Sequence, residues 1–243
     1  MDITEMQNIK SLINREVVLA MGCTEPVAVA LAVTKSRETL GTIPDKVEVN
    51  LSKNIFKNAM GVGIPGTGMI GLPIAIAMGI VAGDSSRALE VLDIPTTEVE
   101  KSKQWLENNK ENLSIQIKET TEKLYVECIC YSGNDKVLAT IAGQHTNFVR
   151  IEKNNSVLLD KPLEATQPTT QTTVHLTMEK VYDFATKTPI EELDFIRETV
   201  RYNTEAAREG AKGYGLCTGK ILLKIAQSIQ KNMLKLCMVC AMH

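Results

Sequence analysis

Apolar residues recur at helical spacing near the start of the chain. In residues 3–21 they fall near one face, which predicts an amphipathic helix. Gly22 follows, and glycine commonly ends helices, so we expect the first helix to stop there. Pro26 suits the first turn of a second helix, which the pattern predicts over 27–40. The chain therefore opens with two helices joined by a short break.

Further along, the hydrophobic pattern changes period twice. The uninterrupted apolar run 69–82 predicts a buried helix, and residues 96–109 predict another. Alternating apolar and polar residues then predict strands at 47–51, 113–117, 123–131, 136–142, 148–151 and 157–159, with a hairpin turn at 132–135. Helical spacing returns at 177–186 and 190–209.

This order of elements predicts the fold class. Helices, then strands, then helices indicate an α+β fold, with a mixed or antiparallel sheet packed with helices. Residues 163–173, rich in Thr, Gln and Pro, are typical of a linker. We therefore predict an α+β domain over 1–165. A helical segment over 166–243 follows it, as the truncated start of a C-terminal domain.

Composition narrows the functional classes. The 243 residues carry 27 basic and 29 acidic side chains and only 4% aromatics. Without a basic stripe or stacking platforms, nucleic acid is not an expected partner. Residues 61–83 are uncharged and long enough to span a bilayer, but seven glycines and two prolines argue against a membrane span.

The amino terminus and the cysteines point to a cellular compartment. No secretory signal is visible in residues 1–10. Six cysteines are scattered at 23, 128, 130, 217, 237 and 240. This distribution favours free or metal-binding thiols in a reducing cytoplasm. The sequence leaves a homo-oligomer open.

The first motif with chemical potential is Gly22-Cys23-Thr24-Glu25-Pro26. It places a thiol at the start of the second helix, where the helix dipole favours a thiolate that can act as nucleophile or metal ligand. Glu25 could carry a proton, or Glu25 or Thr24 could cap the helix. On local physics alone, a buried thiol beside a helix cap is the favoured interpretation.

The second motif is the glycine-rich stretch 61–68, which runs into the apolar helix. Successive backbone N–H groups at such a turn can bind a carboxylate or phosphate. No Gly-Lys-Ser/Thr follows, so it is not a Walker A loop. A flexible connector is an equally good interpretation.

The third motif is Gly143-Gln144-His145-Thr146-Asn147, at the end of a predicted strand. The imidazole of His145 titrates near neutral pH and could transfer a proton, or form a covalent-catalysis pair with Cys23. A satisfied polar group is the more common role for a lone histidine at a strand end.

The remaining cysteines suggest less. Cys128 and Cys130 share one face of a strand, so core packing is expected. The pair Cys237 and Cys240 has metal-binding spacing, but it supplies only half of a tetrahedral site.

Together the three motifs resemble the L-cysteine desulfidase family, which is similar to the alpha chain of iron–sulfur L-serine dehydratase. The resemblance rests on 22–26, on 57–62 leading into 65–73, and on 143–147, and it extends from about residue 10 to about residue 216. It implies a lyase that splits L-cysteine to pyruvate, ammonia and sulfide, or dehydrates L-serine, with a [4Fe–4S] cluster and without pyridoxal phosphate.

The resemblance also implies residue roles. Cys23 would be a cluster ligand or a proton-transfer group, with Glu25 and His145 as further catalytic residues. The implied substrate-binding residues are Thr24, Pro65, Gly66, Thr67, Gly68, Met69, Thr146 and Asn147. The partner would be a small amino acid, L-cysteine or L-serine.

The chain departs from this family in its last part. Members carry their remaining cluster cysteines in a helical second half, and residues 220–243 do not resemble it. A cluster normally needs several thiolates, so the group is not expected to be complete in this chain. The alternative prediction is an inactive or small-molecule-binding fragment.

Overall fold

The computed structural model describes residues 2–20, 22–162 and 174–212. The chain divides into two compact units, Val18–Thr169 and Met1–Val17 together with Thr170–His243. Each is described by itself. The sequence-based boundary near 165 stays a prediction.

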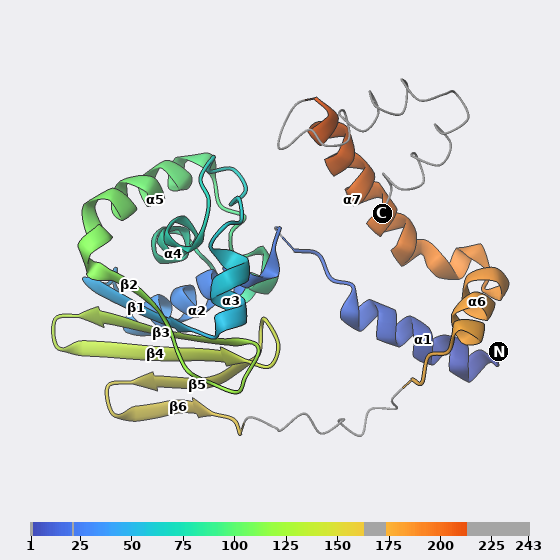
Figure 1. The fold of residues 1–243 in the computed structure, drawn as a ribbon, viewed down its shortest axis with the longest axis horizontal. Coiled ribbons are helices and arrows are strands. Elements are labelled where there is room, and N and C mark those ends of the chain that lie inside the picture. The colour runs from blue at the N-terminus through green and yellow to red at the C-terminus, as the bar shows by residue number, and fades with distance from the viewer. Residues whose placement is uncertain (1, 21, 163–173, 213–243) are drawn as a thin grey trace. The chain divides into compact units, whose positions relative to one another are not determined.

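A six-stranded sheet forms one layer of the unit 18–169 (Figure 1). Its order is β2-β1-β3-β4-β5-β6, and its strands are β1 (Lys46–Leu51), β2 (Leu113–Ile117), β3 (Tyr125–Ser132), β4 (Asp135–Ala142), β5 (Phe148–Lys153) and β6 (Ser156–Asp160). Only β1 and β2 are parallel, and the other neighbours are antiparallel. The sheet is therefore mixed, and the predicted α+β fold is confirmed.

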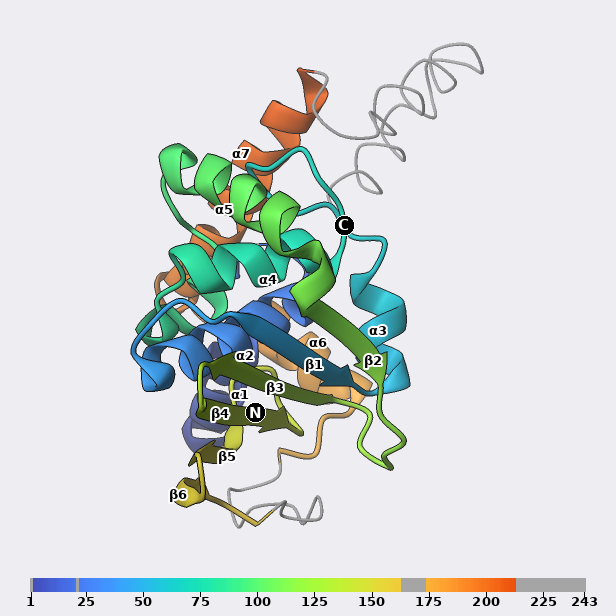
Figure 2. The ribbon, with the colours of Figure 1, turned by 90° about the vertical axis from the view of Figure 1, so that its left-hand side faces the viewer.

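Helices cover one face of this sheet (Figure 2). They are α2 (Thr24–Leu40), α3 (Lys53–Ala59), α4 (Leu72–Val81), the 3-10 turn η1 (Ser85–Glu90) and α5 (Thr96–Asn109). Residues 26–34 of α2 are all buried, because this helix lies between the sheet and α4. A helix that is apolar all round is typical of such a central position.

The backbones of α2 and α4 approach closely at Gly79. A Cβ atom built there would lie 2.7 Å from the carbonyl oxygen of Ala30. The hydroxyl of Thr34 donates to the carbonyl oxygen of Gly79 at 3.1 Å. Glycine therefore sets the distance between the two helices, and Thr34 fixes their register.

Several predicted boundaries shift in the structure. The first helix, α1 (Ile3–Glu16), ends before Gly22, and α4 begins at Leu72, so Met69 lies in the preceding loop. The short helices α3 and η1 were not predicted. The hairpin turn at 132–135 is confirmed, since Ser132 pairs with Asp135 across Gly133 and Asn134.

The second unit contains α1, α6 (Met178–Lys187), η3 (Ile190–Leu193), a further 3-10 turn, and α7 (Asp194–Ala211). Its buried apolar residues are Ile9 and Phe184 within the described part. Ion pairs from Lys10 to Glu192 and from Lys180 to Glu5 join α1 to η3 and to α6. The predicted linker 163–173 and residues 213–243 lie outside the described residues.

The uncharged stretch 61–83 contains one short helix, α4, of ten residues. Among the described residues, no helix is both long and apolar enough to cross a membrane.

Candidate functional site

Cys23 stands at the N-cap of α2, with extended backbone at φ −63° and ψ 128°. The helix begins at Thr24, so Pro26 falls in its first turn as predicted. The predicted caps, Thr24 or Glu25, are wrong. Cys23 occupies the cap position and makes no capping hydrogen bond, because its thiol has another acceptor.

That acceptor is the carboxylate of Glu25. The Cys23 Sγ donates to Glu25 Oε2 at 2.8 Å in a partly buried setting. Burial raises the pKa of the Cys23 thiol, and the hydrogen bond to the carboxylate raises it further. The Cys23 side chain is therefore a protonated thiol at neutral pH. This differs from the thiolate expected from the helix dipole, since burial and then the neighbouring carboxylate both favour the protonated thiol.

Glu25 is the ionised centre of this site. Asn58 Nδ2 donates to Glu25 Oε1 at 3.0 Å, while Oε2 accepts from the Cys23 thiol and, at 3.5 Å, from the hydroxyl of the predicted site residue Thr24. The hydrogen bond from Cys23 lowers the pKa of Glu25 most, burial opposes it, and Asn58 and the nearby charge of His145 lower it further. Glu25 is consequently a carboxylate at neutral pH.

Asn58 is the site residue that the sequence did not single out. It lies on α3, a helix of seven residues that was too short for its apolar periodicity to be recognised. The stretch 57–62 was part of the recognised motif, but nothing in it pointed to the side chain of Asn58. Only the packing of α3 beside the start of α2 brings this amide to Glu25.

The glycine-rich stretch forms a defined hairpin-like loop, not a featureless connector. An antiparallel bridge joins Gly63 to Ile70, and the N–H of Ile64 donates to the carbonyl of Met69 at 3.0 Å. Gly66 and Gly68 have φ of 74° and 68°, which only glycine adopts easily.

Two details of this loop bear on binding. The Thr67 hydroxyl is buried and donates to the Ile64 carbonyl oxygen at 2.7 Å, so it serves the loop itself. Within the described residues, the N–H groups of Gly66 and Gly68 meet no acceptor. These two exposed amides are free to bind an anionic group.

The loop lies against the start of α2. A Cβ atom on Gly22 would be 3.4 Å from the Cγ of Pro65. The structure therefore brings the first two sequence motifs together, as a common site requires.

The third motif forms the turn from β4 to β5. Asn147 Nδ2 donates to the carbonyl oxygen of Ala142 at 3.0 Å, which uses this amide to hold the turn. His145 is partly exposed and near enough to Glu25 to stabilise its charge. Thr146 is exposed.

No hydrogen bond joins Cys23 to His145 among the described residues, because the thiol donates to Glu25 instead. This geometry weakens a nucleophile–base pair of these two side chains. Cys23, Glu25 and His145 stay predicted catalytic residues.

Metal binding has little support from the described cysteines. Cys128 and Cys130 are fully buried, with sulfur atoms 3.9 Å apart, so their predicted place in the core is confirmed. Cys217, Cys237 and Cys240 lie outside the described residues. In the part that the structure describes, no three His, Cys, Asp or Glu side chains come together as a metal site. Cys23 alone does not fit a [4Fe–4S] cluster.

Comparison with known proteins gives relatives without an assigned activity. The chain is 49% identical over 221 residues to a UPF0597 protein of Bacteroides fragilis, a match covering 90% of this chain and 51% of the relative. Similar proteins from Phocaeicola vulgatus (52% identity, 90% and 51% covered) and Aeromonas hydrophila (41%, 87% and 49%) bear the same UPF0597 name. No family model matches the chain, and no solved structure matches it significantly.

These relatives correct the predicted family. The resemblance to L-cysteine desulfidases and serine dehydratase alpha chains is wrong, since the similar proteins carry the UPF0597 name instead. The physical reason lies in the motifs, which consist largely of Gly, Pro and Thr. Here those residues form a helix start, a hairpin-like loop and a strand turn, and such geometry does not specify a reaction. The chain spans about half the length of these three UPF0597 relatives.

Proposed function

We propose that the site around Glu25 binds a small amino acid and belongs to a lyase that acts on L-cysteine or L-serine. The observation that carries the proposal is the Glu25 carboxylate, which accepts from Cys23 at 2.8 Å and from Asn58 at 3.0 Å. Three segments far apart in sequence, at the starts of α2 and β5 and in α3, supply its surroundings. Convergent polar groups with perturbed pKa values are typical of functional sites.

Each group has a chemical task in this proposal. Glu25 attracts the ammonium group of the amino acid through a charge-assisted hydrogen bond. The exposed N–H groups of Gly66 and Gly68 receive the substrate carboxylate. Because the Cys23 thiol keeps its proton, it can donate that proton to the departing hydroxide or hydrogensulfide group. In its neutral form His145 takes the proton from the α-carbon, and it later returns that proton through water to the Cys23 thiolate, which restores both groups.

These steps balance as a β-elimination. The carbon–hydrogen bond at the α-carbon and the bond to the β-substituent break, and a carbon–carbon double bond forms. The aminoacrylate product hydrolyses with water to pyruvate and ammonia. No step is derived through an iron–sulfur cluster, because the described residues do not supply its ligands. We propose the cytoplasm as the site of this reaction, because thiols stay reduced there.

A second candidate function is binding without turnover. This function is favoured by the partial coverage of the relatives, because the chain matches only about half of the Bacteroides fragilis protein. The other half of that protein could complete the catalytic machinery. In that case the site would hold the amino acid through Glu25 but would release it unchanged.

Calorimetric titration of the chain with L-cysteine and L-serine tests binding. The variant Glu25→Gln should lose affinity about tenfold or more, because it removes the charge that attracts the ammonium group. Glu107→Gln is the matched control, since Glu107 is exposed on α5 and pairs only with Lys110. No heat with either amino acid, or equal affinity in all three proteins, would refute the proposed site.

Pyruvate release, measured by coupled NADH oxidation, separates the two functions. It is measured for this chain and for the full-length relative from Bacteroides fragilis. Pyruvate from either protein supports the lyase. Binding by this chain without pyruvate from either protein supports the second candidate and refutes the first.

A further inference from the structure

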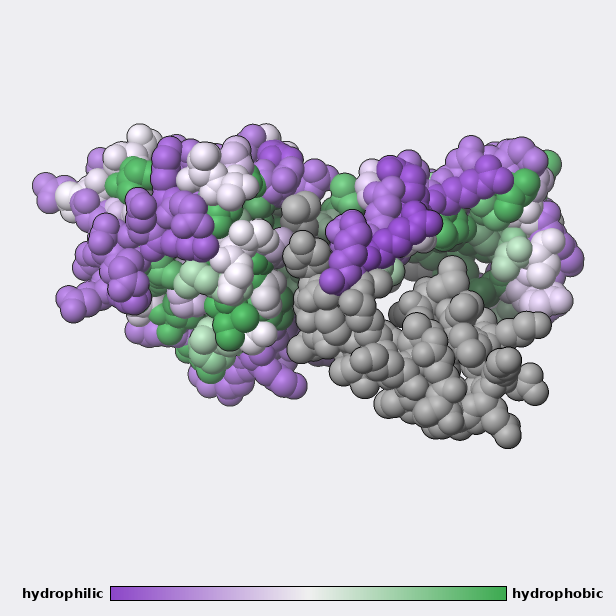
Figure 3. All heavy atoms as spheres, turned by 90° about the horizontal axis from the view of Figure 1, so that it is seen from above, coloured by the Kyte–Doolittle hydropathy of each residue, from purple (hydrophilic) through white to green (hydrophobic). Residues whose placement is uncertain are grey.

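Helix α7 presents one apolar face along its length. Ile196, Val200 and Ala207 repeat at helical spacing, and all three are exposed. The exposed fractions are 37% for Ile196 and 51% for Val200. Figure 3 shows that hydrophobic surface interrupts the hydrophilic surface on both parts of the chain. We call Ile196, Val200 and Ala207 the apolar face of α7.

Two polar side chains on or beside this face bond to the backbone of α7 itself. Asn203 Nδ2 donates to the carbonyl oxygen of Thr199 at 2.8 Å, and the Thr199 hydroxyl donates to that of Phe195 at 3.1 Å. Neither side chain needs water for these bonds. These two bonds would stay paired if an apolar partner covered the face.

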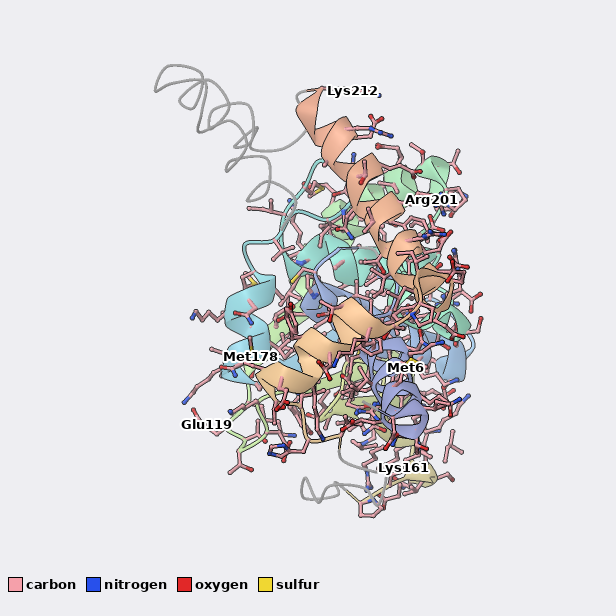
Figure 4. The ribbon with its side chains drawn as sticks, turned by 90° about the vertical axis from the view of Figure 1, so that its right-hand side faces the viewer. Met6, Glu119, Lys161, Met178, Arg201 and Lys212 are labelled. Atoms are coloured by element: carbon pink, nitrogen blue, oxygen red, sulfur yellow. The ribbon has the colours of Figure 1, made fainter. Side chains whose placement is uncertain are left out.

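The opposite face of α7 is suited to water. Arg201 lies within ion-pair distance of Glu198 at 3.1 Å and of Glu205 at 3.4 Å, one turn away on either side. Figure 4 labels Arg201 and Lys212 on this helix. The contrast between the two faces makes α7 strongly amphipathic, the pattern of a helix that packs on one side only.

Within the described residues, nothing covers the apolar face. None of the 17 residues of α7 described for burial, 194–210, is buried, whereas α1 and α6 each bury one apolar side chain, Ile9 and Phe184. Isolated helices of this length are marginal in water, because helices in proteins gain most of their stability from packing. A helix of this kind needs a partner surface.

The length of the relatives identifies that partner. A match over 90% of this chain must include α7, because α7 ends more than a tenth of the chain length before residue 243. The match covers 51% of the relative. The relative therefore contains the region of α7 and, outside the match, about as much chain again.

We infer that the apolar face of α7 is the docking surface for the half of the UPF0597 proteins that this chain does not span. The partner offers an apolar groove or helix face complementary to Ile196 and Val200. The inference does not depend on the reaction proposed above.

Co-expression tests it. The part of the Bacteroides fragilis relative outside the match is produced together with this chain, which carries an affinity tag, and the complex is purified and weighed by light scattering. A one-to-one complex is expected. In Ile196→Asn/Val200→Asn the recovered partner should fall about tenfold, since a few central apolar residues carry most interface energy.

The matched control is Arg197→Asn/Arg201→Asn, with the same new residue and spacing on the polar face. It should retain the partner, because exposed ion pairs contribute little. Circular dichroism checks that both variants keep the same helix content. Failure of the unmodified chain to retain the partner would overturn the inference, as would equal loss in both variants. Self-association of the chain alone that Ile196→Asn/Val200→Asn abolishes would also overturn it, in favour of a second copy.

Discussion

The close approach of α2 and α4 at Gly79 makes the substitution Gly79→Ala a sensitive test of the core. The new Cβ atom would lie 2.7 Å from the Ala30 carbonyl oxygen, 3.1 Å from Thr34 Oγ1 and 3.3 Å from Ala30 Cα. Two of these three atoms belong to the α2 backbone, so a side-chain rotation cannot relieve the contact. The two helices would have to separate, against a core that is packed as densely as a crystal.

The expected loss of stability can be worked from two opposing effects. Overpacking a core costs about 1–3 kcal/mol. Replacing a helical glycine with alanine returns up to about 1 kcal/mol through backbone entropy. The net result should be a loss of roughly 1–2 kcal/mol, which lowers the urea midpoint by roughly 0.5–1 M at the slopes usual for small proteins.

Trp105 provides the assay. It is the only tryptophan of the chain and packs against the core from α5, so its fluorescence reports the unit that contains Gly79. Gly61→Ala is the matched control, because a Cβ atom there meets no atom within 4 Å and the backbone is not left-handed. It should change stability by less than about 0.5 kcal/mol. A midpoint for Gly79→Ala at or above that of the unsubstituted protein would refute the packing argument.

Other predictions concern ionisation and thiol access. Burial disfavours the charge of Glu127, but hydrogen bonds, led by that from Lys118, outweigh it and lower its pKa. A lowered pKa stabilises the fold above the ordinary glutamate range and loses that effect as pH falls. Glu127→Gln should therefore cost about 2 kcal/mol at pH 7 and less at pH 3, by urea titration at both values; an equal loss at both would contradict this. In alkylation followed by peptide mapping, Cys23 should be modified in the folded protein and Cys128 only after unfolding. Glu25→Gln should accelerate the Cys23 reaction, because losing the carboxylate lowers the thiol pKa; an unchanged or slower rate would show that the carboxylate does not hold the proton.

Sequence periodicity predicted most of the α+β unit because its elements have clear patterns. Apolar and polar residues alternate along the central strands of the sheet, and the hairpin at 132–135 has its turn residues at the expected place. The parallel pairing of β1 with β2 was not predictable, since it depends on where the intervening helices return the chain. The early end of α1 at Glu16 was missed because apolar residues continue at 17–20, although these residues are not helical.

The candidate site was predicted in part. Cys23 and Glu25 are neighbours in the sequence, so their pairing needed only the start of α2 to be placed correctly. Asn58 and the proximity of His145 follow from tertiary packing that a single sequence does not reveal. The predicted thiolate state of Cys23 was wrong for a similar reason. A helix start can be predicted from the sequence, but the burial of the thiol and the orientation of the Glu25 side chain cannot.

The three groups around Glu25 lie at very different separations from it along the sequence, and this has a consequence for folding. The thiol of Cys23 is two residues away and can meet the carboxylate as soon as the first turn of α2 forms. Asn58 is 33 residues away, and His145 is separated from Glu25 by most of the unit, so both must wait for large loops to close. Refolding should therefore assemble the site in two steps, with a slow final step in which Glu25 acquires its amide and imidazole neighbours after the local hairpins have formed.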